Sequence, residues 1–127
     1  MQPRETLKSF FKMGPRLIKK SLRLNWKKLN GLIPIITQDF KNNKVLMLGF
    51  MNKVALEKTL KEGKVTYFSR TRKELWPKGA TSGHPQLVKE IWVDCDNDAL
   101  LIKVEQIGNV CHTGRKSCFY QKIDEKK

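Results

Sequence analysis

Three aspartates, Asp94, Asp96 and Asp98, stand at alternate positions within five residues of a strongly basic chain. Carboxylates this close repel one another unless they are solvated or share a cation, and hard oxygen ligands suit Mg²⁺ or a similar divalent ion. Aspartate and asparagine are also common in turns that bind no metal. Because three aspartates are more than a turn requires, the pattern favours a metal site.

All three cysteines of the chain, Cys95, Cys111 and Cys118, lie in the same stretch. Three is an odd number for a disulfide framework, which favours free thiols able to bind Zn²⁺ in a reducing compartment. Their spacing matches no common zinc finger, so three buried core cysteines are an equally good interpretation. If all three bind zinc, the fourth position stays open for a water whose pKa would fall to about 7. The residues therefore indicate a hydrolytic metal site, with a purely structural alternative left open.

Two histidines are candidates for proton transfer. His112 follows Cys111 directly, which places it to act as a proton shuttle, and His84 is the alternative. A lone histidine is as often a hydrogen-bonded structural residue, so the pattern leaves both roles open for each.

Residues 70–85 are predicted to form a loop rich in charge and glycine. A loop this long in a small domain is usually functional or disordered. Its side chains suit a phosphorylated substrate because cationic groups and hydroxyls bind phosphate and an aromatic ring can stack on a base; they are Arg70, Arg72, Trp76, Lys78, Thr81 and Ser82. The alternative is a solvated loop that Trp76 anchors to the core.

Length and charge set the broad class. A chain of 127 residues with a formal net charge of +14 fits one domain that meets an anionic partner, whether nucleic acid, membrane surface or phosphorylated metabolite. No apolar run is long enough to span a bilayer and no secretory signal is present, so we expect a cytoplasmic protein. We divide the chain into a basic amphipathic extension, residues 1–21, and one domain, residues 22–127.

Hydrophobic periodicity predicts an α+β, β-rich antiparallel domain. An amphipathic basic helix is expected over residues 5–24, and a short internal helix is expected to begin after Asn52 and end at Gly63. Strands are expected at residues 32–38, 44–50, 64–69, 87–93, 99–106 and 117–123. The acidic cluster then lies at the tip of a hairpin.

Several motifs follow one another in order along residues 22–121. They include Trp76-Pro77-Lys78-Gly79, Ser82-Gly83-His84, Asp94-Cys95-Asp96-Asn97-Asp98, Cys111-His112-Thr113-Gly114-Arg115 and Cys118-Phe119-Tyr120. Together they closely resemble the phosphoribosyl-AMP cyclohydrolase family of histidine biosynthesis. The resemblance implies hydrolytic opening of the adenine ring of phosphoribosyl-AMP at the bond between N1 and C6. It also implies an intertwined homodimer with a zinc site shared between subunits.

The resemblance implies a role for each candidate residue. Asp94, Asp96 and Asp98 would bind Mg²⁺, and Cys95 of one chain would join Cys111 and Cys118 of the other around Zn²⁺. His112 would transfer protons, with His84 as the alternative. The substrate-binding residues would be Arg70, Arg72, Trp76, Lys78, Ser82, His84 and Arg115.

Four positions depart from the usual family pattern: Pro77, Ala80, Pro85 and Lys116. Every proposed metal ligand is present, so these departures bear on the geometry of the loop rather than on the chemistry. The rival interpretation is a basic nucleic-acid-binding module with a structural zinc, which would bind DNA or RNA with a steep salt dependence.

Overall fold

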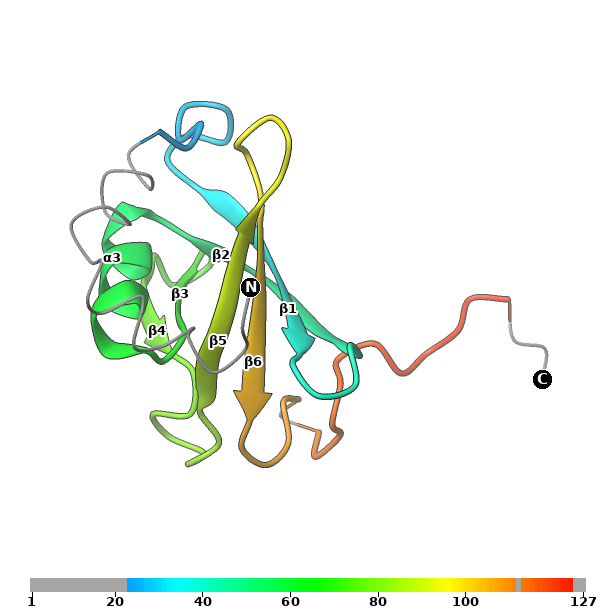
Figure 1. The fold of residues 1–127 in the computed structure, drawn as a ribbon. Coiled ribbons are helices and arrows are strands. Elements are labelled where there is room, and N and C mark those ends of the chain that lie inside the picture. The colour runs from blue at the N-terminus through cyan, green and yellow to red at the C-terminus, as the bar shows by residue number, and fades with distance from the viewer. Residues whose placement is uncertain (1–22, 112, 125–127) are drawn as a thin grey trace.

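A four-stranded sheet, a two-stranded sheet and one α-helix make up the part of the chain that the computed structural model describes, residues 23–111 and 113–124 (Figure 1). In chain order the elements are β1 (Ile33–Asp39), β2 (Val45–Met51), α3 (Lys53–Glu62), β3 (Thr66–Ser69), β4 (Glu74–Pro77), β5 (Gln86–Val93) and β6 (Leu100–Gln106). The expected α+β, β-rich class with one short internal helix is confirmed.

The larger sheet is mixed, so the expectation of a wholly antiparallel domain is wrong. Its strand order is β2-β1-β6-β5, and β1 pairs with β6 in parallel while the other two pairs are antiparallel. Within each hairpin, β1–β2 and β5–β6, the two strands pair antiparallel as expected. They join through β1 and β6, and the long connection through α3 and the small sheet lets these two strands run in the same direction.

The internal helix begins and ends where the sequence predicts. The Asn52 side chain accepts a hydrogen bond from the Ala55 N–H over 2.8 Å, which satisfies one of the free donors of the first turn. Gly63 ends the helix in the left-handed conformation, with φ of 73°, and its N–H bonds the Thr59 carbonyl. Local capping chemistry alone therefore sets both ends of α3.

Three other segments were predicted to be a loop, a strand and a helix. The predicted loop over residues 70–85 contains strand β4, which pairs with β3 from Thr66↔Pro77 to Ser69↔Glu74. Residues 117–123 are not a strand, although their apolar side chains fit one; Phe119 and Tyr120 are exposed there. The helix expected over residues 5–24 lies almost wholly outside the described residues.

Within residues 23–111 and 113–124, the helix and the small sheet cover one face of the larger sheet. Ile33 and Ile35 of β1, with Ile102 and Val104 of β6, are fully buried beneath α3 and the small sheet. The opposite face carries exposed apolar side chains. In the described part of the chain, no helix is both long enough and apolar enough to cross a membrane.

Candidate active site

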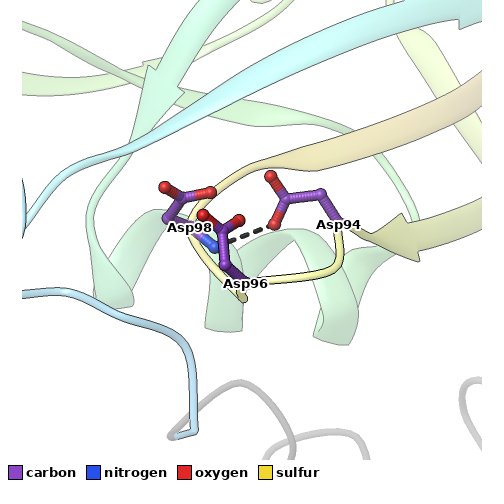
Figure 2. A group of neighbouring side chains, drawn as sticks. All are labelled: Asp94, Asp96 and Asp98. Atoms are coloured by element: carbon purple, nitrogen blue, oxygen red, sulfur yellow. Dashed lines mark hydrogen bonds between the residues drawn. The ribbon is translucent and has the colours of Figure 1, made fainter.

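The acidic cluster forms the turn between β5 and β6, as the sequence predicts. Asp94 organises the turn: its Oδ1 accepts hydrogen bonds from the Asp98 N–H over 2.9 Å and the Ala99 N–H over 3.2 Å. Figure 2 shows the three carboxylates gathered above this turn, and one ligand oxygen from each lies within 4.8 Å of the others. Three hard oxygen donors at this separation fit a divalent cation such as Mg²⁺.

A lysine that sequence reasoning missed neutralises part of this cluster. The Lys28 ammonium contacts the Asp98 carboxylate and lies 3.9 Å from Asp96. The hydrogen bond from Lys28 lowers the pKa of Asp98 to about 2, whereas hydrogen bonding to Asp98 raises the pKa of Asp96. The cluster therefore attracts positive charge. Lys28 lies 66 residues before Asp94, so only the fold reveals the pair.

Two of the three thiols lie together in the segment that follows β6. The Thr113 hydroxyl donates to Cys111 Sγ over 3.1 Å and lowers the pKa of that thiol. Partial burial and the nearby Cys111 raise the pKa of Cys118. One easily ionised thiol beside a less acidic one is a suitable start for a soft-metal site, because the thiolate is the form that binds Zn²⁺.

Backbone hydrogen bonds hold this thiol segment in place. The Cys111 N–H bonds the Arg115 carbonyl over 3.1 Å, which closes the turn. The Cys118 N–H then bonds the Leu46 carbonyl of β2 over 2.8 Å, and the Ser117 hydroxyl bonds the Val45 carbonyl over 2.9 Å. The segment is thereby fixed to the edge of the larger sheet without becoming a strand of it.

Cys95 does not join the other two thiols within one chain. In residues 23–111 and 113–124, the three aspartates are the only group of three potential ligands that gathers within 4.8 Å. Cys95 belongs to the turn before β6 and Cys111 to the segment after it, so the seven residues of β6 separate them (Figure 1). At about 3.3 Å per residue, this strand spans roughly 20 Å.

A cavity of about 280 Å³ opens beside Cys111, and several predicted substrate-binding residues line it together with Asn109: Trp76, Lys78, Ser82 and His84. The Lys78 ammonium donates to the Val110 carbonyl over 2.6 Å and lies 5.2 Å from the centre of the Trp76 ring. Burial lowers the pKa of Lys78, and the neighbouring Cys118 and Cys111 oppose that shift. Lys78 thus anchors the thiol segment and brings positive charge to its sulfur atoms.

Gly108 leaves the space that the His84 side chain occupies. A Cβ at Gly108 would come within 2.5 Å of His84 Cδ2, so the close approach of the imidazole requires a residue without a side chain. Gly108 also has a φ of 71°, which favours glycine independently. The Gln106 side chain bonds the His84 carbonyl over 3.4 Å and extends the support into β6.

The three predicted phosphate-binding arginines are not among the residues that line this cavity. Arg70 lies over the Phe50 ring at 4.1 Å, and Arg72 pairs with Glu74 at 3.7 Å. Arg115 lies over the Tyr120 ring at 4.2 Å. His112 lies outside the described residues. The residues to which the sequence assigned no role are Lys28, Gly108, Asn109 and Thr113. Of these, only Thr113 belongs to one of the motifs quoted for the family resemblance.

Comparison with known proteins identifies the family of the chain. Residues 47–120 match the family model for phosphoribosyl-AMP cyclohydrolase. A phosphoribosyl-AMP cyclohydrolase of Clostridium beijerinckii is 52% identical over 107 residues, covering 84% of this chain and 98% of that protein. One from Clostridium botulinum strain Okra is 60% identical over 104 residues, covering 82% and 94%, and one from Listeria monocytogenes is 60% identical over 95 residues, covering 75% and 90%. The chain therefore belongs to the phosphoribosyl-AMP cyclohydrolase family.

Proposed function

We propose that this protein hydrolyses phosphoribosyl-AMP in histidine biosynthesis, with residues 22–127 as the catalytic domain and residues 1–21 as a basic extension. The observation that carries the proposal is the cavity beside Cys111, because it combines a stacking surface at Trp76, a cation at Lys78 and a seated imidazole at His84. Family membership identifies the reaction that these groups serve.

The reaction adds water across one bond of the purine. The oxygen of water bonds to C6, the bond between N1 and C6 breaks, and the two hydrogens go to N1 and to the exocyclic nitrogen. The product is the formimino-carboxamide ribotide. When bound, Zn²⁺ would acidify the attacking water and Mg²⁺ would offset phosphate charge.

The residues of the chain have separate tasks in this proposal. Trp76 stacks on the purine, and Ser82 donates a hydrogen bond to the substrate. His84, held against Gly108, is available for proton transfer, as is His112. Lys78 keeps the Cys111 segment in place through Val110 and favours ionised thiols. Arg70, Arg72 and Arg115 lie outside the cavity and would reach phosphate only from its surroundings.

The metal sites would divide by ligand type. Asp94, Asp96 and Asp98 would hold Mg²⁺ through oxygen. Cys111 and Cys118 would hold Zn²⁺ together with the Cys95 thiol of a second copy, because Cys95 of the same chain lies in the turn at the other end of β6. A shared site of this kind requires a homodimer.

The other face of the larger sheet, which no element of the described residues covers, supports a homodimer. Leu48, Ile36, Leu101 and Trp92 form one row across the four strands, because Ile36 pairs with Leu48 and Leu101, and Leu101 pairs with Trp92. Leu48 is 51% exposed, Trp92 50% and Ile36 41%. A contiguous apolar row on a sheet face marks an interaction surface, and a second copy also completes the thiol set.

The first experiment tests the reaction itself. Purified protein should contain tightly bound zinc and should produce the ultraviolet change that accompanies purine ring opening when mixed with phosphoribosyl-AMP. Cys111→Ala should lose both zinc and turnover. Turnover that survives without zinc, or a protein that ignores this nucleotide and binds nucleic acid instead, would contradict the proposal.

Mixing variants tests whether the zinc site is shared. Cys95→Ala and Cys111→Ala should each be inactive alone. After unfolding and refolding together, half of the dimers contain one of each chain, and each such dimer has one intact shared site, so about a quarter of wild-type activity should return. Sites built within one chain would return none.

A further inference from the structure

A second cavity, of about 320 Å³, lies between the β1–β2 hairpin and the segment that follows β6. Figure 1 shows this segment passing beside the hairpin, and the bonds from Ser117 and Cys118 to β2 confirm the contact. Lys44 and Asn42 line the cavity from the hairpin, and Lys116, Gly108 and Asn109 line it from the other side. Lys44, Asn42 and Lys116 have no role in the proposed catalytic or metal-binding sites.

The lining suits an anion. Lys44 and Lys116 are exposed, and neither forms an ion pair with a residue in the described part of the chain. The lining also holds one carboxylate, Asp39, whose Oδ1 accepts from the Lys41 N–H over 2.7 Å and the Asn42 N–H over 3.3 Å. Two lysines against one carboxylate leave the lining with net positive charge.

Amide donors complete the set. The Asn42 Oδ1 accepts from the Lys44 N–H over 2.9 Å, which leaves the Asn42 NH₂ group as a donor. Asn109 contributes a second amide. Ammonium and amide donors around a small cavity are the groups that bind a phosphate monoester.

This cavity and the one beside Cys111 adjoin each other. Asn109 lines both cavities. Gly108 lines the Lys44–Lys116 cavity and supports the His84 imidazole, which lines the Cys111 cavity. A ligand centred on the Cys111 cavity can therefore extend past Asn109 toward Lys44 and Lys116.

We propose that the Lys44–Lys116 cavity is a phosphate subsite, which receives the 5′-phosphate of one ribosyl arm while the purine lies beside Cys111. The inference rests on the proposed function, because that substrate carries two phosphorylated arms on one purine. The Cys111 cavity offers one lysine, Lys78, whose ammonium is already bonded to a carbonyl. The neighbouring Lys44–Lys116 cavity supplies positive charge for the second phosphate.

Steady-state kinetics of Lys44→Gln and Lys116→Gln test the subsite. Each change should raise KM for phosphoribosyl-AMP about tenfold and leave kcat within about twofold, because a charge-assisted hydrogen bond made equally in the ground and transition states is lost. Lys→Arg at either position should retain most of the affinity. Lys53→Gln is the matched control, because Lys53 is an exposed lysine on α3 away from both cavities.

Smaller probes identify the arm and separate the two proposals. Inorganic phosphate should inhibit the wild type competitively and should inhibit the double variant Lys44→Gln/Lys116→Gln more weakly. The substrate carries one phosphoribosyl arm on N9 of the purine and one on N1, and AMP carries only the arm on N9. Weaker inhibition of the double variant by AMP therefore assigns the cavity to the N9 arm. Unchanged inhibition by AMP assigns it to the N1 arm.

Unchanged KM in variants of an active enzyme, or the same rise in the Lys53→Gln control, would overturn the subsite and leave the proposed function intact. A folded wild type with no turnover would instead contradict the proposed function. Phosphate binding measured by calorimetry, lost in the double variant, would then still support the subsite.

Discussion

Tyr67→Phe probes the buried polar chain that connects the core to the candidate active site. The Tyr67 side chain is fully buried, and its hydroxyl donates to Gln86 Oε1 and accepts from Thr37 Oγ1, each over 2.6 Å. Gln86 continues the chain to Gln106 over 2.9 Å, and Gln106 bonds the His84 carbonyl. Phenylalanine removes one oxygen and keeps the ring.

The expected cost follows from the two partners left behind. Thr37 and Gln86 are each 0% exposed, so bulk water does not replace the lost hydroxyl. A buried polar group without its partner costs about 1–3 kcal/mol, which gives about 2–6 kcal/mol for the pair. Since a domain of this size is stable by about 5–15 kcal/mol, we expect Tm to fall by about 10 °C.

Urea and thermal unfolding, followed by circular dichroism, measure this change. Tyr120→Phe is the control, because it deletes the same atom from a phenol that is 42% exposed, and its unfolding free energy should change by less than about 0.5 kcal/mol. The ring of Tyr120, which lies under Arg115, is preserved.

A double variant separates hydrogen bonding from packing. Thr37→Val combined with Tyr67→Phe replaces both members of one pair by apolar groups, so the double variant should lose less stability than the sum of the two single changes. A loss below about 0.5 kcal/mol for Tyr67→Phe, or strict additivity with Thr37→Val, would refute the reasoning.

Two further predictions concern pH and metal. Burial raises the pKa of Tyr67 well above its ordinary value of 10, so the folded state retains this proton at a pH where the unfolded state loses it. The free energy of unfolding should therefore be intact below about pH 10 and should fall as pH rises above it. The fall should be shallower in Tyr67→Phe. Unfolding free energies between pH 8 and 11 check this, and equal slopes would contradict it. Asp94→Asn keeps a side-chain oxygen for the Asp98 and Ala99 N–H groups, so its Tm should stay close to wild type while Mg²⁺ affinity falls about tenfold or more; Asp94→Ala should lower both. Calorimetric titration with Mg²⁺ measures the affinity, and unchanged binding in Asp94→Asn would exclude that carboxylate as a ligand.

The sequence predicted well what a few neighbouring residues decide. Asn52 and Gly63 bound the helix because capping depends on local hydrogen bonds and on one backbone conformation. The three aspartates meet because one turn brings them together. Prediction failed for β4 and for residues 117–123, because a strand exists only where a partner strand is present, and local β propensity does not specify the partner.

The order of its residues thus determined, without any structure, the family of the chain, its helix ends, its acidic turn and the identity of its candidate ligands. The tertiary structure decided which of them meet: β1 lies parallel to β6, Lys28 reaches Asp98, and Gly108 supports His84. It also placed Cys95 before β6 and Cys111 after it, at opposite ends of that strand. These relations depend on the pairing of segments far apart in the chain, which sequence spacing does not encode.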